Sequence, residues 1–140
     1  MRISAECDYA CKALLELALH WPGKEPVKIT AIAKKQNIPI KYLEQILIEL
    51  KNIGMVESIR GKNGGYRLLK EPVKISLGEV MRHLGGPLLP VADSAIKKGS
   101  VFATIWQELE RTMAGMLDKI NFEYIANKAK GIEKAVIYQI

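Results

Sequence analysis

Apolar residues recur at helical spacing through the first fifty residues, and they predict three helices. Residues 4–21 are almost all good helix formers, with Ser4 suited to the N-cap. A loop rich in proline and glycine separates them from a short helix over residues 28–36. The next helix covers residues 39–52 and carries an i, i+3, i+4, i+7 stripe of Leu43, Ile46, Leu47 and Leu50. Two short helices joined by a tight turn are typical of a helix-turn-helix.

A β-hairpin is predicted next, because apolar residues alternate on both sides of a turn rich in glycine and asparagine. We expect strands at residues 55–59 and 66–69, joined by residues 60–65. The turn carries Arg60 and Lys62 and no acidic residue. A hairpin that follows a helix-turn-helix is a wing, so the predicted fold class is mainly α, a winged helix-turn-helix.

The C-terminal part is predicted to be helical as well. Ser76 and Glu79 form a capping box that opens a helix ending near Leu84. After a loop, apolar residues repeat at alternate spacings of four and three, which is a heptad seam. The seam consists of Phe102, Trp106, Leu109, Met113, Met116 and Ile120. We expect this long helix to pack against its twin in a dimer, although a helix folded onto its own domain would show the same stripe. A final short helix over residues 122–128 is expected to dock behind it.

These elements divide the chain into three parts. We expect residues 1–84 to form a winged helix-turn-helix unit of the kind that binds DNA, residues 85–99 a linker or sensor-type loop without cysteine, and residues 100–140 a dimerisation helix with a C-terminal tail. The chain of 140 residues is 49% hydrophobic and 26% charged, which is typical of a globular protein. We find no membrane-spanning run and no signal-peptide pattern, and two cysteines make no disulfide framework, so we expect a cytoplasmic protein.

The charge is unevenly distributed along the chain. The net charge is +6, and residues 1–74 hold 13 Lys and Arg against 8 Asp and Glu, whereas the remainder holds 8 against 7. A local basic excess indicates a phosphate-binding surface. A solvated lysine-rich face would give the same balance.

Six segments together resemble one family of bacterial transcription regulators, the Rrf2 family. They are the residues Met-Arg-Ile-Ser at 1–4, Asp-Tyr-Ala at 8–10, Tyr-Leu-Glu-Gln at 42–45, Arg-Gly-Lys-Asn-Gly-Gly-Tyr at 60–66, Ile-Ser-Leu-Gly-Glu-Val at 75–80 and, more loosely, the Trp-x-x-Leu pattern at 106–109. The resemblance implies a homodimeric winged-helix protein that binds a roughly palindromic operator, usually as a repressor. Its recognition helix would be Ile40–Lys51.

The resemblance also implies roles for individual residues. Those facing the major groove are Lys41, Glu44 and Gln45; Arg60 enters the minor groove; and Tyr42, Lys62 and Asn63 lie near phosphates. Side-chain chemistry agrees, since glutamine can bond adenine edges, glutamate can accept from a cytosine amino group, and arginine suits a narrow minor groove. Tyr42 packed on the core and Lys41 as a solvated charge are the alternatives.

Well-known members of this family hold an iron–sulfur cluster with three cysteines in the loop before the long helix. Residues 88–99 contain no cysteine or histidine here, so we expect no cofactor of that kind. Asp8 aligns with a carboxylate that ligates a cluster in some relatives. Without the cysteines, we expect Asp8 to be a surface or capping carboxylate.

The two thiols of the chain, Cys7 and Cys11, lie four residues apart and therefore on one helix face. Ordinary packing accounts for them most simply. A redox switch is an alternative, because the helix dipole would lower the pKa of a thiol in the first turn. A zinc or iron site that adds His20 or His83 is another.

The sequence carries no nucleophile elbow, phosphate loop or cluster of histidines and carboxylates, so we expect no enzyme. The predicted partners are double-stranded DNA and a second copy of the chain. An alternative is a regulator controlled by a bound enzyme, as the cysteine-metabolism repressor of this family binds cysteine synthase. RNA binding through the basic wing is a third.

Overall fold

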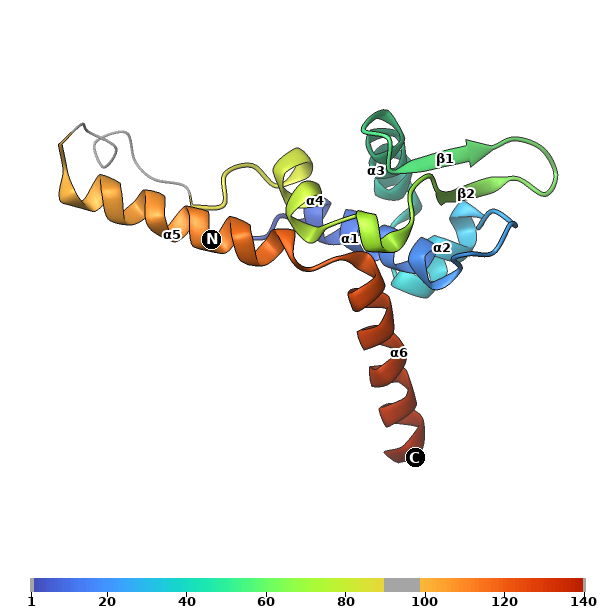
Figure 1. Ribbon diagram of the computed structural model, residues 1–140. Coiled ribbons are helices and arrows are strands. Elements are labelled where there is room, and N and C mark those ends of the chain that lie inside the picture. Colours follow the sequence, from blue (N-terminus) through green and yellow to red (C-terminus); the bar gives the residue numbers. More distant parts are fainter. Residues whose placement is uncertain (1, 90–98, 140) are drawn as a thin grey trace.

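The computed structural model describes residues 2–89 and 99–139 and is mainly helical, with one two-stranded antiparallel sheet (Figure 1). The winged helix-turn-helix fold predicted from the sequence is confirmed, and two further helices follow it. The elements in chain order are α1 (Ala5–Leu19), α2 (Ile29–Gln36), α3 (Ile40–Asn52), β1 (Val56–Ile59), β2 (Gly65–Leu68), a 3₁₀ turn η1 (Pro72–Lys74), α4 (Leu77–Leu84), α5 (Val101–Asp118) and α6 (Phe122–Gln139).

The first helix is the centre of the fold. The Ser4 hydroxyl caps it by accepting the amide N–H of Cys7 at 3.1 Å. Helix α1 packs against α2, α3, α4 and α6. Its core face consists of small and medium apolar residues, among them Ala10, Ala13, Leu14 and Leu17, all buried. Small residues let several neighbouring helices approach one axis closely.

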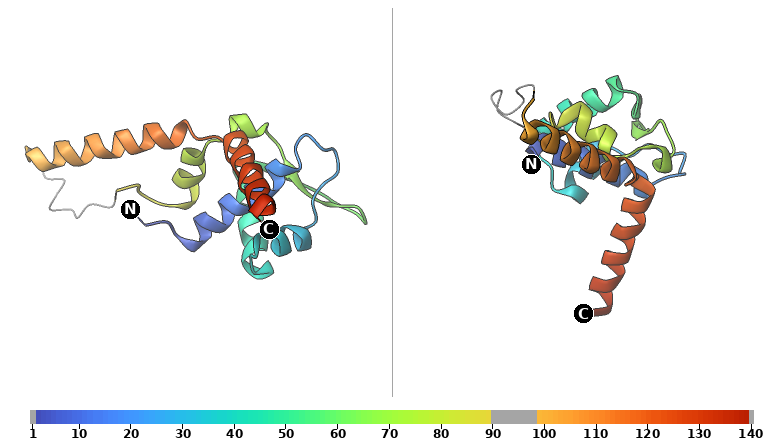
Figure 2. Two further views of the ribbon diagram at one scale, coloured as in Figure 1. Left: turned by 90° about the horizontal axis from the view of Figure 1, so that it is seen from below. Right: turned by 60° about the vertical axis from the view of Figure 1, so that its left-hand side comes forward.

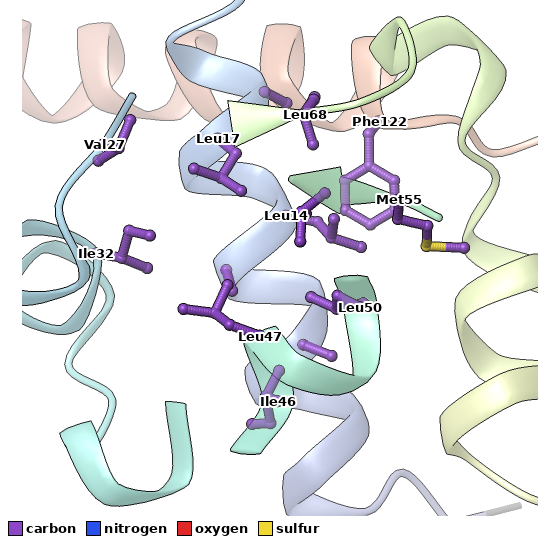
Figure 3. Packing of buried hydrophobic residues seen from close by; sticks show 14 of the residues in the cluster. Leu14, Leu17, Val27, Ile32, Ile46, Leu47, Leu50, Met55, Leu68 and Phe122 are labelled. Atoms are coloured by element: carbon purple, nitrogen blue, oxygen red, sulfur yellow. The ribbon is translucent and has the colours of Figure 1, made fainter. Parts of the chain in front are cut away.

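The main core lies between α1, α3 and the hairpin (Figure 3). The stripe on α3 supplies Leu43, Ile46, Leu47 and Leu50, each at most 2% exposed. Phe122, the first residue of α6, is fully buried in the same cluster. The C-terminal region therefore contributes to the core of the DNA-binding unit.

The connection between α2 and α3 is a tight turn. Asn37 ends α2 with φ 53° and ψ 52°, a left-handed conformation that asparagine tolerates. The next residue, Ile38, is buried, and its amide donates to the carbonyl of Ala33 at 2.9 Å. This geometry fixes the angle between the two helices of the helix-turn-helix.

The hairpin pairs Val56 with Leu68 at its base and Ile59 with Gly65 at its tip. A third segment joins it, because Val27 exchanges two backbone hydrogen bonds with Tyr66, at 2.7 and 2.8 Å. Gly65 has φ 157°, and a Cβ there would lie 2.4 Å from the Val27 carbonyl oxygen. Only glycine permits this close approach.

The C-terminal helices extend away from the winged unit in two directions (Figures 1 and 2). Their joint is a short backbone pairing in which Leu77 N–H donates to Ile120 at 2.7 Å and Phe122 N–H donates to Ile75 at 3.0 Å. Asn121 then caps α6 by accepting the Tyr124 amide at 2.9 Å. The chain therefore turns sharply between α5 and α6.

The structure corrects the prediction for the last helix. It runs through Gln139 instead of ending near residue 128, and its first turns pack on α1 and η1. The helix continues through Gly131, because one glycine costs only about 1 kcal/mol and the flanking residues favour a helix. Residues 90–98 of the expected loop lie outside the described residues. Within the part that the structure describes, no helix is long and apolar enough to cross a bilayer.

Candidate nucleic-acid interface

The face of α3 opposite its buried stripe carries the residues predicted to contact DNA. Lys41, Tyr42, Glu44 and Gln45 are all exposed. They share one surface because the apolar stripe of the same helix occupies the core side. A polar helix face next to a basic hairpin has the shape and chemistry needed to enter a DNA groove.

The hairpin presents the other predicted contacts at its tip. Arg60, Lys62 and Asn63 are exposed. The tip turns through Gly61, at φ 111°, and Gly64 N–H donates to the Gly61 carbonyl at 3.0 Å. Figure 1 shows α3 and the hairpin on one side of the molecule and α6 projecting from the other. The structure thus brings all seven predicted residues to neighbouring surface elements.

Arg67 on β2 holds the hairpin against the loop between α1 and α2. Its Nε donates to the Glu57 carboxylate on β1. Its Nη1 donates to the backbone carbonyl of Lys24 at 3.1 Å. One guanidinium therefore connects both strands to a third segment, and together with the Val27–Tyr66 pairing it sets the direction of the wing.

A groove of about 480 Å³ separates the wing tip from this loop, and the sequence analysis missed its basic residues. Lys24 and Lys28 line it together with Asn63, and Glu25 between the two lysines also lines it. Lys24 lies within the proline-rich loop and Lys28 at its end, far along the chain from the hairpin. The sequence spacing gives no sign that this loop lies beside the hairpin, so only their charge could have indicated them. They extend the basic surface from the wing to the start of α2.

An acidic groove borders α3 on its other side. It measures about 510 Å³ and lies between α1 and α3, lined by Tyr9, Tyr42 and the carboxylates of Glu6 and Glu49 among others. A hydrogen bond with Glu6, reinforced by partial burial and the charge of that carboxylate, raises the pKa of Glu49. Tyr42 and Gln45 line the same groove, so its two carboxylates lie beside predicted DNA contacts and disfavour phosphate on the α1 side of α3.

The predicted contact Tyr42 has a neighbour on α1. Its ring lies 6.3 Å from that of Tyr9, centroid to centroid, at a tilt of 37°. The side chain is nevertheless 63% exposed. Tyr42 is therefore an exposed side chain that contacts Tyr9, and it is not a core residue.

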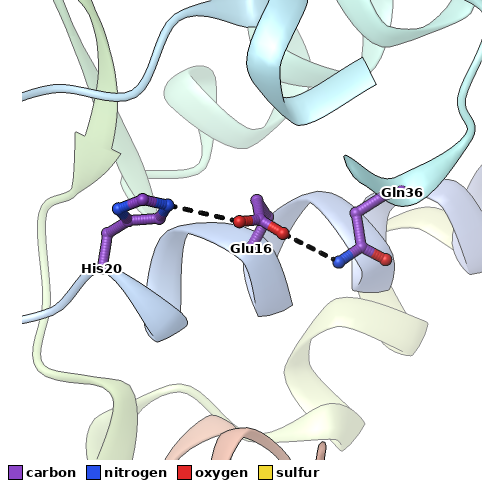
Figure 4. Close-up of polar contacts among 3 residues, drawn as sticks. All are labelled: Glu16, His20 and Gln36. Atoms are coloured by element: carbon purple, nitrogen blue, oxygen red, sulfur yellow. Dashed lines mark hydrogen bonds and ion pairs between the residues drawn. The ribbon is translucent and has the colours of Figure 1, made fainter. Parts of the chain in front are cut away.

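Glu16 is buried and links α1 to the end of α2 (Figure 4). Its carboxylate accepts Gln36 Nε2 at 3.1 Å and pairs with His20 Nε2 at 3.2 Å. A buried carboxylate needs such partners to offset its lost hydration. The contact positions α2, and through the Asn37 turn it positions α3.

Five of the six predicted dimerisation residues lie on α5, and they differ in exposure. None of residues 101–118, all described, is fully buried. Phe102, Leu109 and Met116 are exposed, and the ring of Phe102 stacks on Trp106 at 5.8 Å. Met113 instead packs against a small buried cluster in its own chain. The remaining seam residue, Ile120, is half-buried at the joint with α4, where its carbonyl accepts the Leu77 amide.

The structure shows how far the two cysteine side chains are buried, and burial determines the direction of their pKa shifts. Cys7 is 1% exposed and Cys11 half-buried. Burial raises the pKa of Cys7, and it raises the pKa of Cys11 to about 12. The expectation of a helix-lowered thiol pKa is therefore wrong, because desolvation disfavours the thiolate. Asp8 forms a surface ion pair with Lys12 at 2.9 Å, as expected for a surface carboxylate.

The zinc or iron site considered with His20 does not form. His20 follows the last residue of α1, nine residues after Cys11, which is about 14 Å along a helix axis. His83 is exposed on α4. Within residues 2–89 and 99–139, no three His, Cys, Asp or Glu side chains come together as metal ligands.

The sequence matches a known protein family over most of its length. The Rrf2 family, described as an iron-dependent transcriptional regulator, matches residues 3–128. The transcriptional regulator CymR of Bacillus subtilis is 33% identical over 140 residues, covering 100% of this chain and 100% of that protein.

Solved structures show the same fold. The structure of CymR, the global cysteine regulator of B. subtilis, superposes with a TM-score of 0.79 at 33% identity, over 91% of this chain and 98% of that one. The structure of IscR from T. potens superposes with a TM-score of 0.76 at 32% identity, over 92% and 88%. The arrangement of wing, helix-turn-helix and C-terminal helices is therefore shared with both.

Proposed function

Because the chain belongs to the Rrf2 family of transcriptional regulators, we propose that it is a repressor that binds a roughly palindromic operator as a homodimer. The observation that carries this proposal is the exposed polar face of α3 together with the basic tip of the hairpin whose strand β1 contacts α3. Membership in a family of regulators also confirms that the chain is not an enzyme. DNA is its partner, and we place its action in the cytoplasm.

We assign recognition of the operator bases to α3 and to one residue of the wing. Gln45 bonds an adenine edge, and Glu44 accepts from a cytosine amino group while its charge disfavours other bases. Arg60 enters the minor groove next to the half-site. The side chains of Tyr42, Lys62 and Asn63 contact phosphates, and we add Lys24 and Lys28 to this group because they border the same groove as Asn63.

Dimerisation is assigned to α5. Its exposed apolar residues Phe102, Ile105, Leu109 and Met116 form a stripe that water disfavours. Packing this stripe against its copy places two recognition helices on one duplex, and two-fold symmetry in the protein is mirrored by a palindromic operator. Control by a bound enzyme, the alternative from the sequence, stays a prediction.

We propose that the protein acts without an iron–sulfur cluster of the family type. Such a cluster takes four protein ligands, usually cysteine thiolates. The sequence holds two cysteines, both on α1, so the donor set does not fit the cluster. We therefore infer that the stimulus to which this regulator responds differs from the one sensed by relatives that hold a cluster.

The test is selection of bound duplexes from a random library, followed by fluorescence anisotropy on the selected sequence. We expect an enriched palindrome and two chains per duplex by light scattering. If the dimer contacts about 6–10 phosphates, affinity should fall by about three to five decades between 50 and 200 mM salt. No enriched sequence, or a monomer on half of the palindrome, would overturn the proposal. A competing single-stranded RNA that displaces the duplex would favour the RNA alternative.

A further inference from the structure

An exposed isoleucine lies among the residues of α3 that are proposed to face DNA. Ile48 is 51% exposed, whereas the other isoleucine in the middle of this helix, Ile46, is 2% exposed. Single apolar side chains at a protein surface are common and need no explanation by themselves. What distinguishes Ile48 is its place on the helix.

The buried and the exposed face of α3 follow the same spacing. The buried stripe has the pattern i, i+3, i+4, i+7 and begins at Leu43. Shifted back by two residues, this pattern gives a stripe whose members are all exposed, namely Lys41, Glu44, Gln45 and Ile48. Two residues turn a helix by about 200°, so the exposed stripe lies opposite the buried one. Ile48 therefore completes the row formed by the three residues predicted to face the major groove.

The charged residues on either side of Ile48 are engaged with other elements. Glu49 forms a hydrogen bond with Glu6 on α1. Lys51 Nζ donates to Ser58 Oγ on β1 at 3.0 Å. These contacts attach the second half of α3 to α1 and to the wing, while Ile48 between them stays exposed.

The chemistry of the DNA bases decides what an apolar side chain can recognise in the major groove. Thymine is the one base that presents a methyl group there, and apolar side chains contact this group. Contact between an isoleucine and a methyl group removes apolar surface from water on both partners. We propose that Ile48 contacts the 5-methyl group of a thymine and makes the operator specific for thymine at one position of each half-site. This inference rests on the proposed function.

Helix geometry gives the approximate place of this thymine. Ile48 follows Gln45 by three residues, which corresponds to about 4.5 Å along the helix axis. Successive bases of one strand are about 3.4 Å apart along the duplex. The thymine therefore lies about one or two base pairs from the adenine assigned to Gln45.

The test replaces the thymines of the selected operator with deoxyuridine, one position at a time. Deoxyuridine lacks only the 5-methyl group, so the hydrogen-bond donors and acceptors of the base pair stay the same. We expect one position in each half-site at which the replacement weakens binding about fourfold, the effect of losing one buried methyl group. Replacement in both half-sites should weaken binding about fifteenfold, because distant sites act additively. Anisotropy titrations of the unmodified chain measure these changes.

A variant identifies the side chain that contacts the methyl group. Ile48→Ala should bind the thymine operator at least about tenfold more weakly, since it loses several buried carbons in each half-site. Deoxyuridine at the sensitive position should then change its affinity by less than about twofold. The matched control is Ile132→Ala, because Ile132 is 59% exposed on α6. This control should respond to deoxyuridine as the unmodified chain does.

The outcomes separate this inference from the proposed function. If a palindrome is selected but no deoxyuridine replacement weakens binding of the unmodified chain, the role of Ile48 is refuted and the DNA-binding proposal stands. A selected half-site without thymine at the expected distance would refute it too. An equal response of Ile48→Ala and the unmodified chain would assign the methyl contact to another residue. If no sequence is selected, the proposed function fails, and this inference fails with it.

Discussion

Gln36 donates to the buried carboxylate of Glu16 at 3.1 Å, and this bond joins the end of α2 to the last turn of α1. Glu16 is 5% exposed, so water cannot readily replace the lost donor. We expect Gln36→Ala to lower the free energy of unfolding by about 1–3 kcal/mol. Urea denaturation measures this, with Lys35→Ala on the exposed face of the same helix as control. Equal midpoints for the two variants would contradict the role of this contact.

Gly78 on α4 leaves room for the end of α5. A Cβ at this position would lie 2.1 Å from Asp118 Oδ1, and Asp118 also pairs with Arg82 at 2.8 Å. Gly78→Ala must displace that carboxylate, so we expect a loss of about 1–3 kcal/mol in stability. In the Asp118→Ala background the same substitution should cost less. Additive effects in this double-mutant cycle would show that the contact is unimportant.

Arg67 is expected to act on DNA binding through the direction of the wing. Arg67→Lys keeps the positive charge but removes the guanidinium group, whose two nitrogens donate to Glu57 and to the carbonyl of Lys24. We expect a loss of about 0.5–2 kcal/mol on the selected operator, the scale of residues that act without touching the ligand. Binding to random duplex should change little. An equal loss on both duplexes would instead make Arg67 a simple phosphate contact.

The two basic residues of the wing tip should differ in effect. Arg60→Ala removes the contact proposed to read bases, so it should cost about 1–3 kcal/mol on the operator and relax specificity. Lys62→Ala removes a contact proposed to bind phosphate, so it should weaken all duplexes alike and lower the salt slope by about one. Anisotropy titrations on operator and random duplex at several salt concentrations separate these outcomes. Identical profiles for both variants would refute the division.

The thiols give the folded protein a pH dependence. Burial raises the pKa of Cys11 from 9.0 to about 12. The folded state therefore holds a proton that the unfolded state has lost, and the contribution of this thiol to stability falls as pH rises above 9.0 toward 12. Below that range the contribution is fully present. Unfolding curves at pH 7, 9 and 10 should show a shallower decline for Cys11→Ala than for the unmodified chain, and parallel declines would contradict this.

Local patterns predicted the fold well because short-range physics determines these elements. The stripe on α3 places Leu43 and Leu47 in the core, and the same periodicity leaves Gln45 on the surface. The glycine-rich turn likewise exposes Arg60. The motif resemblance pointed to the family to which the chain belongs.

The C-terminal helices were harder to predict. The heptad spacing along α5 predicts one continuous dimer interface. In the structure, however, Met113 packs against its own chain while Met116 is exposed. Helix periodicity shows which residues are apolar and which face they share. It cannot show which neighbour covers each of them.

The helices, the hairpin, the excess of basic residues and the scarcity of thiols were predictable without coordinates, since each depends on residue types and their spacing. Three contacts became visible only in the folded chain: Arg67 reaches the loop before α2, Gln36 reaches Glu16, and Met81 and Met113 pack in one cluster with the two cysteines. These contacts join residues up to about a hundred positions apart. Their formation depends on how whole elements pack against one another, because close packing of the interior brings distant segments together.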